Sequence, residues 1–337
     1  MRRISAIVLL VMSILCSCST DVDIYTDLED TTIVYGVMDV AKDTNFIKII
    51  RAFAGSNSDS FDANEIAMIA DSSNYPGKLD ARFLEYKGGT NGKTYLPTGR
   101  EIILDTITVN NKEEGQFYSP NQKLYYTTEH FNVNSLYNRY KYKFLILKSN
   151  DTISSEVSLI GGERFQIVTP KVFFKVGSFE KRKIYFTPDD NDAMYKATMQ
   201  FNYKEVKHGH DTVYKNVNWS YGPSSTFDLG YEGGNLYYTY RENQLFSLLE
   251  NAIGDDNLNV ERFFDSFVIT IFAYGKELEE YMQISEATSG IEYYYTNIHG
   301  GLGILSSSHE ISKNVEISSR TMTDLLSMDW GFKHIGY

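Results

Sequence analysis

The sequence predicts a mainly β protein, and three of its features support this fold class. Its 337 residues include 26 Tyr and 20 Phe but only 6 Pro, a composition that favours strands. Short segments alternate apolar and polar residues and end at turn-forming residues, as half-buried antiparallel strands do. Apolar residues make up 42% of the chain, which is enough for a packed core, so a disordered stalk is excluded.

The first third of the chain is expected to alternate strands and turns. A segment with helical spacing at residues 63–70 follows Asp62, a residue type that caps helices, and ends at the turn formers of residues 71–77. A glycine-rich loop at residues 88–92 separates two strands, which predicts a hairpin. The strands expected in this part are residues 33–39, 45–53, 78–86 and 101–109.

The next two expected strands, residues 137–148 and 152–160, complete a set with the spacing of an immunoglobulin or fibronectin type β-sandwich. Turn formers at residues 161–162 and 169–170 then mark a boundary. A chain of this length is long enough for two cores. We therefore expect two domains, a β-sandwich at residues 32–166 and a second β-rich domain at residues 167–337.

The second domain is expected to contain one or two helices among further strands. Residues 242–253 place Leu245, Leu248 and Leu249 on one face and end before Gly254, a pattern typical of an amphipathic helix with a glycine stop. Residues 277–283 are a shorter helix candidate. The expected strands are residues 171–176, 183–186, 193–207, 211–219 and 261–274.

The N-terminal segment has the features of a cleaved export signal. Two arginines precede an apolar stretch at residues 4–15, which is too short to span a bilayer. Residues 15–18, Leu-Cys-Ser-Cys, resemble the bacterial lipobox. This resemblance implies a lipoprotein signal peptide at residues 1–17 and lipidation of Cys18, with diacylglycerol on its thiol and an acyl chain on its amine. An ordinary secretory peptide is the alternative.

Residues 18–31 are expected to form an acidic tether between the anchor and the first domain. Asp21 and Asp23 resemble the surface-export signal of Bacteroidota lipoproteins, which implies an outer-membrane lipoprotein on the cell surface. The periplasmic face is the alternative. The formal net charge of −12 argues against nucleic acid and an anionic lipid surface as partners, because both require clustered Lys and Arg.

A glycine-rich block near the C-terminus resembles a family. Residues 295–307 read YTNIHGGLGILSS, and an uncharacterised group of Bacteroidota outer-membrane lipoproteins, a domain of unknown function, carries a similar YTNI-x-GGLGIF-S block. The resemblance implies no assigned activity. We interpret the glycines as permitting positive φ and close backbone packing, with a binding loop as the alternative. The block residues of interest are Asn297, Gly300, Gly301 and Gly303.

Two polar segments carry ligand-type side chains without the spacing of a metal site. Residues 208–211, His-Gly-His-Asp, favour a hairpin tip over a metal corner because strand patterns flank them. Residues 189–192, Asp-Asp-Asn-Asp, lack the spacing and distal Glu of a calcium loop, so a solvated turn is expected. No Gly-x-Ser-x-Gly motif is present. We expect no catalytic residue, no metal and no cofactor.

Two functions from different classes remain. The first, which we prefer, is a non-catalytic cell-envelope lipoprotein that serves as a surface binding or scaffold module of an outer-membrane uptake or assembly system. Its partners would be the membrane through Cys18, an outer-membrane transporter or other envelope protein, and a peptide or a glycan. The alternative is an extracellular polymer hydrolase that uses acidic residues. A flat aromatic surface favours the first function, and a cleft with two facing carboxylates favours the second.

Overall fold

The computed structural model confirms that the protein is mainly β, with several sheets and few helices. The predicted signal peptide, most of the tether and the helix expected at residues 63–70 lie outside the residues that the structure describes. Those residues are 31–52, 73–89, 94–114, 118–135, 137–148, 151–170, 173–174, 181–207, 211–241, 243–253, 260–287 and 295–334.

Eight strands form a β-sandwich in the N-terminal half. One sheet has the order β1-β2-β6-β5 and the other β4-β3-β7-β8, with antiparallel neighbours throughout. Lettered in chain order, these are A-B-E-D and C′-C-F-G, the arrangement of immunoglobulin-like sandwiches, which confirms the predicted type. The strands are β1 (Thr32–Met38), β2 (Asn45–Arg51), β3 (Asp80–Gly88), β4 (Tyr95–Ile103), β5 (Asp105–Val109), β6 (Gln122–Thr127), β7 (Tyr140–Leu147) and β8 (Thr152–Val157).

The two sheets of the sandwich enclose one hydrophobic core. Val34 and Ile47 enter it from the first sheet, and Phe83 and Phe144 enter it from the second, each fully buried. Successive side chains of a strand point to opposite faces, so the residues between these core positions form the outer surfaces of the sandwich.

One predicted strand, residues 101–109, is wrong as a single element. β4 ends at Ile103 and pairs with β3, whereas β5 begins at Asp105 and pairs with β6 in the other sheet. Leu104 is fully buried where the chain crosses between the sheets. Apolar alternation continues through this crossing, so periodicity gives no sign of it. The hairpin predicted around residues 88–92 is confirmed, because β3 and β4 are antiparallel neighbours.

The C-terminal half contains long antiparallel strands and a second, four-stranded sheet of order β14-β15-β11-β9 around a separate core. The helices predicted at residues 242–253 and 277–283 are confirmed as α3 and α4, and α4 is longer than expected. The elements are β9 (Gln166–Thr169), β10 (Phe173–Phe174), β11 (Lys181–Thr187), β12 (Asp192–Lys207), β13 (Val213–Ser225), β14 (Gly230–Glu232), β15 (Asn235–Arg241), α3 (Gln244–Ile253), β16 (Val260–Gly275), α4 (Lys276–Ala287), β17 (Leu302–Ile317) and α5 (Ser319–Ser327).

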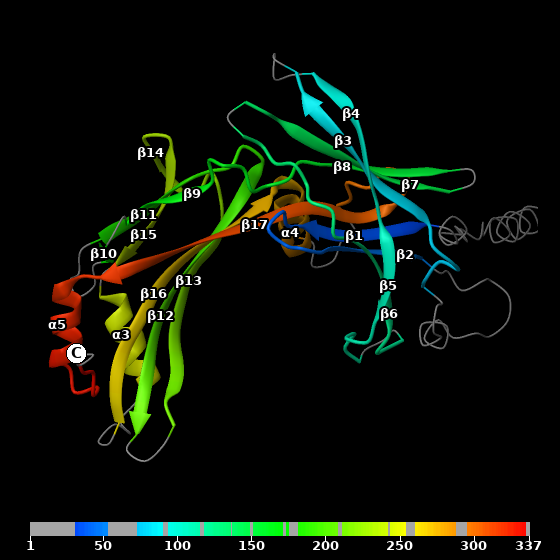
Figure 1. The fold of residues 1–337 in the computed structure, drawn as a ribbon. Coiled ribbons are helices and arrows are strands. Elements are labelled where there is room, and N and C mark those ends of the chain that lie inside the picture. The colour runs from blue at the N-terminus through cyan, green and yellow to red at the C-terminus, as the bar shows by residue number, and fades with distance from the viewer. Residues whose placement is uncertain are drawn as a thin grey trace, which may run out of the picture.

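Strand β17 joins the two halves of the molecule. Its residues 302–307 pair in parallel with β1, and its residues 308–315 pair antiparallel with β16. One sheet therefore continues through both halves in the order β13-β12-β16-β17-β1-β2-β6-β5. Figure 1 shows β17 crossing the molecule from α5 at one end to β1 at the other.

The buried apolar residues form two clusters. One contains residues between Val34 and Leu159 together with Ile298 and Leu305, and the other contains residues between Ile160 and Phe332. β17 contributes to both clusters, with Leu305 in the first and Val315 in the second. The domain boundary near residue 166 stays a prediction.

Glycines of the block at residues 295–307 let β17 approach β1. Gly300 and Gly303 have φ angles of 76° and 103°, in the left-handed region that favours glycine. A Cβ atom at Gly303 would lie 2.0 Å from the backbone oxygen of Val34, and a Cβ atom at Gly301 would lie 2.6 Å from that of Thr32. Two of the three glycines thus have the expected positive φ, and Gly301 instead provides room for the neighbouring backbone.

We predict that Gly303→Ala lowers the free energy of unfolding by ~3 kcal/mol or more, because the added Cβ both strains φ and pushes β17 away from β1. Gly99→Ala is the control, since Gly99 has a φ of 83° but no atom within 4 Å of its Cβ position. Strain alone should cost about 1 kcal/mol there. Urea unfolding measures both values, and equal losses would contradict the role of Gly303 in the β1–β17 contact.

Candidate functional site

A pocket lies at the end of the sandwich where residues 74–77, just before β3, meet the end of β2 and the start of β6. Its volume is about 330 Å³, and it is lined by Arg51, Asn74, Tyr75, Pro76, Gly77 and Lys123. Arg51 ends β2, the residues at 74–77 precede β3, and Lys123 is the second residue of β6. Connections gather at the two ends of such a sandwich and commonly carry its binding residues.

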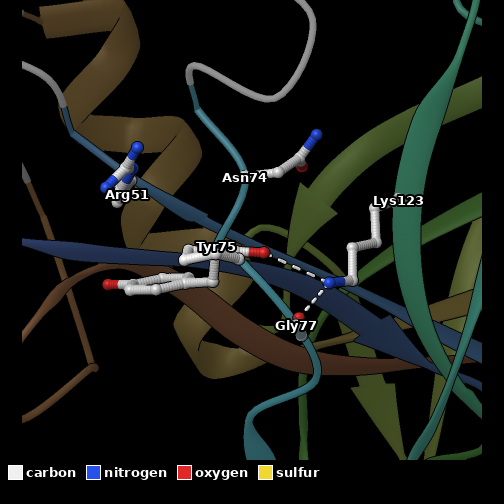
Figure 2. A pocket seen from close by; sticks show the side chains of 6 residues that line it. Arg51, Asn74, Tyr75, Gly77 and Lys123 are labelled. Atoms are coloured by element: carbon white, nitrogen blue, oxygen red, sulfur yellow. Dashed lines mark hydrogen bonds between the residues drawn. The ribbon is translucent and has the colours of Figure 1, made fainter.

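Lys123 is positioned by backbone carbonyl groups. Its ammonium donates to the carbonyl oxygen of Tyr75 at 3.2 Å and to that of Gly77. Figure 2 shows Arg51 and Lys123 on opposite sides of Tyr75, with Asn74 beside them. An ammonium carries three N–H donors, and these two bonds use two of them. The cation is therefore held at the pocket wall instead of extending into solvent.

Tyr75 forms the floor of the pocket and closes this end of the hydrophobic core. Its side chain is only 9% exposed, and its hydroxyl lies 2.5 Å from Thr32 Oγ1 on β1. Lys148 donates to the same hydroxyl at 3.4 Å and lies 5.1 Å from the ring centroid. Cation–π attraction of this kind favours a positive charge beside Tyr75. Three cationic side chains, Arg51, Lys123 and Lys148, thus surround one tyrosine.

The pocket lining combines cationic and amide side chains. Its described residues include two cations, Arg51 and Lys123, and one amide, Asn74. Arg and Lys provide charge-assisted hydrogen bonds to phosphate or carboxylate oxygens. Sequence reasoning missed this site because Arg51, Tyr75 and Lys123 are far apart in the chain and belong to no motif. The fold brings these residues together because the end of β2, the segment before β3 and the start of β6 lie at the same end of the sandwich.

A second surface lies on the sheet face opposite the core, and we call it the outer face. It consists of Tyr35 and Val37 of β1, Phe46 of β2, Tyr126 of β6 and Ile107 of β5. Their neighbours Val34, Ile47 and Tyr125 point into the core, so alternation places these side chains outward. Tyr35, Val37, Phe46 and Ile107 are 43%, 42%, 45% and 41% exposed.

The outer face is continuous across its strands. Phe46 and Tyr126 are paired residues of β2 and β6, with ring centroids 6.2 Å apart, and Tyr126 pairs with Asp105 of β5. Lys48 lies on the same side of β2, where it donates to Gln122 at 2.7 Å. Burial lowers the pKa of Lys48, and the nearby Lys112 adds to this effect. Aromatic and aliphatic side chains therefore dominate this surface.

Glu85 is a buried carboxylate that holds the sandwich together. Its Oε2 accepts hydrogen bonds from Tyr142 and Asn132 at 2.8 Å each, and Arg100 lies 3.3 Å away. Burial opposes ionisation, but these hydrogen bonds and the positive charge of Arg100 lower the pKa of Glu85. Tyr142 also bonds the backbone of Asn132 before strand β7, in the manner of the tyrosine corner of immunoglobulin-like domains.

The solvated turn predicted at residues 189–192 is wrong for Asp189. This residue is only 6% exposed, and its Oδ2 accepts hydrogen bonds from the backbone N–H groups of Gly161 and Gly162 at 3.2 and 2.7 Å. Asp190 forms an ion pair with Arg139. Asp189 is buried because the turn packs against the connection between β8 and β9, whose backbone amides need an acceptor once they are buried.

Glu205 is a further carboxylate in structural contacts. Its two carboxylate oxygens pair with Arg262 at 2.8 Å and Lys215 at 2.7 Å, across neighbouring strands. Burial opposes the ionisation of Glu205, but hydrogen bonds from Lys215 and Arg262 lower its pKa. Arg262 is almost completely buried and also donates to the carbonyl oxygen of Trp330 at 2.6 Å. This network ties the C-terminal residues to β12 and β16.

The block residue Asn297 has a structural position. Its side-chain amide accepts from the N–H of Leu305 at 2.9 Å and donates to the carbonyl of Leu305 at 2.6 Å. The backbone of His299 exchanges two hydrogen bonds with Ser154 of β8. Asn297, Gly301 and Gly303 therefore lie at the β1–β17 junction, Gly300 lies beside Thr152 and Ile153 of β8, and none of the four lines the pocket.

The remaining predicted sites are only partly described. Cys18 lies outside the described residues, as do residues 208–210 of the His-Gly-His-Asp segment, which connects the antiparallel strands β12 and β13. Within the described ranges, His, Cys, Asp and Glu side chains form no group of three or more suited to a metal ion. The described helices include none that is both long and apolar enough to cross a bilayer.

The pKa of Glu277, in the first turn of α4, is raised, whereas the pKa values of Glu85 and Glu205 are lowered. Burial raises the pKa of Glu277, and the nearby Glu280 contributes to the increase. Ser306, fully buried on β17, donates to Glu277 Oε2 at 3.1 Å. Burial and Glu280 also raise the pKa of Tyr295. This cluster links α4 to β17.

Comparisons with known proteins assign no family to the chain. No protein-family model matches it, and no curated protein matches it significantly. Among solved structures, it is similar to the C-terminal globular domain of an oligosaccharyltransferase from Pyrococcus abyssi, with 13% identity and a TM-score of 0.18. The match covers 56% of this chain and 38% of that one. At this TM-score the similarity carries no argument.

We predict that Glu277→Gln is more stable than the wild type at neutral pH, and that this gain disappears at acid pH. Because the pKa of Glu277 is higher in the folded state, the folded state binds the proton more tightly, and stability falls as pH rises from the ordinary carboxyl pKa through the raised one. Gln removes this loss. Thermal melts over a pH series measure it, with Glu250→Gln on the exposed side of α3 as the control. An unchanged pH profile for Glu277→Gln would contradict the raised pKa.

Proposed function

We propose that this protein is a non-catalytic cell-envelope lipoprotein, anchored through Cys18, that binds a protein partner of an outer-membrane uptake or assembly system. The observation that carries the proposal is the outer face, where Tyr35, Val37, Phe46, Tyr126 and Ile107 form an apolar surface on the sandwich. Exposed apolar patches of this kind mark interaction sites in soluble domains. Aromatic side chains are enriched in the buried centres of protein interfaces.

A protein partner fits the shape of the outer face better than a small ligand does. Pockets for small molecules are concave and enclose most of the ligand, whereas the outer face is one side of a sheet. The described pocket is lined by residues at the sandwich end and by none of the outer-face side chains. An apolar partner surface, such as one on an extramembrane face of an outer-membrane transporter, matches the chemistry of the outer face. The family resemblance to Bacteroidota lipoproteins supports the same setting.

The contacts of the buried carboxylates favour a binding module over the alternative hydrolase. Glu85, Asp189 and Glu205 each have their oxygen atoms committed to cations, hydroxyls or backbone amides of the fold. A polymer hydrolase needs one protonated and one ionised carboxyl group that face each other across the substrate. Glu277 has the raised pKa of an acid, but its contacts are with Ser306 and the start of α4.

Membrane attachment is tested by Cys18→Ala. We expect the variant to leave the lipid-anchored membrane fraction, because two or more acyl chains supply the anchoring energy and the substitution removes the acceptor thiol. Metabolic labelling with a palmitate analogue, read together with detergent partitioning, measures the loss. Labelling that persists at wild-type level in Cys18→Ala would exclude lipidation of this residue.

Partner binding is tested by Phe46→Asp, which places a charge at the centre of the outer face. Burying an unpaired carboxylate at an interface is costly, so we expect at least a tenfold weaker complex with an integral outer-membrane protein. Native purification after crosslinking in intact cells measures this complex. Leu96→Asp is the matched control, because Leu96 is an exposed apolar residue of β4 in the other sheet. Equal loss in both variants, or a complex that contains only a second copy of this chain, would overturn the assignment.

A further inference from the structure

We infer that the partner of the outer face presents an acidic side chain to Lys48 within an otherwise apolar contact. This inference rests on the proposed function, which assigns the outer face to a protein partner. It adds the chemistry that this partner carries: an aspartate or glutamate surrounded by apolar side chains.

Lys48 lies among the aromatic side chains of the outer face. It pairs with Tyr35 of the neighbouring strand β1, and paired residues of antiparallel strands share one face of the sheet. Phe46 lies two residues before Lys48 on the same side of β2, and its ring centroid is 6.2 Å from that of Tyr126. A partner that packs on these rings therefore also covers the ammonium group of Lys48.

Within the residues that the structure describes, the charge of Lys48 is not paired with a carboxylate. Its ammonium donates to the neutral side-chain amide of Gln122 at 2.7 Å, and this bond uses one of its three N–H donors. Asp105, which pairs with Tyr126 at the border of the outer face, forms its ion pair with Lys78 at 3.0 Å. Burial is the largest influence on the pKa of Lys48 and lowers it, as expected for a cation without a counter-charge.

The cost of covering Lys48 favours a partner that supplies a carboxylate. An ammonium group that loses its water without a counter-charge is costly to bury, and a purely apolar surface offers it no acceptor. A carboxylate compensates the charge and accepts the remaining N–H groups in charge-assisted hydrogen bonds. A cation at the same place would instead repel Lys48. The apolar side chains thus supply the contact area, and Lys48 selects among the surfaces that could fill it.

A zero-length crosslink in intact cells tests the contact directly. A water-soluble carbodiimide activates a carboxylate, the ε-amine of Lys48 displaces the urea by-product, and an amide bond forms where the two groups touch. Peptide mass spectrometry then identifies the residue that is joined to Lys48. We expect an aspartate or glutamate of an integral outer-membrane protein. Lys143 is the control: it lies between the core residues Tyr142 and Phe144 of β7, on the outward side of the other sheet, and should not be joined to that protein.

Charge reversal measures how much the contact contributes. Lys48→Glu should weaken the complex with the crosslinked protein by about tenfold or more, whereas Lys48→Arg should retain it. Replacing the crosslinked carboxylate of the partner by lysine should restore binding to Lys48→Glu. Lys143→Glu makes the same change of charge on the other sheet, so its affinity should stay within about twofold of wild type. Thermal melts of the purified variants check that each one is folded.

A photoreactive phenylalanine analogue at position 35 separates this inference from the proposed function, because it couples to any partner of the outer face whatever its charge. Photocrosslinking at position 35 without carbodiimide coupling of Lys48 would overturn the acidic contact and leave the protein partner in place. No crosslink by either chemistry would overturn both. Coupling of Lys48 only to carboxylates of this chain, in the same or a second copy, would also overturn the inference, as would equal losses in Lys48→Glu and Lys143→Glu.

Discussion

The pairing of β17 with both β1 and β16 is the contact on which the rest of the structure depends. The first residues of β17 pair with β1 of the N-terminal sandwich, and its later residues pair with β16 of the C-terminal half. A single strand therefore joins the two halves in one continuous sheet. The parallel contact with β1 requires backbones to approach closely, and this requirement explains Gly301 and Gly303. Asn297 supports the same strand through its two hydrogen bonds to Leu305.

Buried charged groups occur where elements distant in sequence must be joined. Glu85 connects β3 to the approach to β7, Asp189 connects the turn after β11 to the connection after β8, and Arg262 connects β16 to the C-terminal residues. Leaving such a group without partners in an apolar interior is costly, so each one specifies a single arrangement of its neighbours. Two of these groups, Glu85 and Asp189, are acidic, so part of the acidic composition of the chain is structural.

Two surfaces of opposite character remain available for function on the sandwich. The outer face is apolar, and the described lining of the pocket includes two cationic side chains, although both belong to the same sandwich. Their separation has a geometric cause: side chains alternate across the sheet, whereas the connections and strand ends gather at one end of the sandwich.

The sequence by itself determined the mainly β class, the sandwich type, most strand positions and the helices α3 and α4, because alternation and amphipathic spacing are local properties. It also indicated that the glycine block is structural. Only the tertiary structure decided that residues 101–109 divide between two sheets, that residues 302–317 form one long strand shared by both cores, and that Asp189 is buried. It alone assembled the pocket from Arg51, Tyr75 and Lys123. These features depend on which distant segments become neighbours, and local periodicity carries no information about that choice.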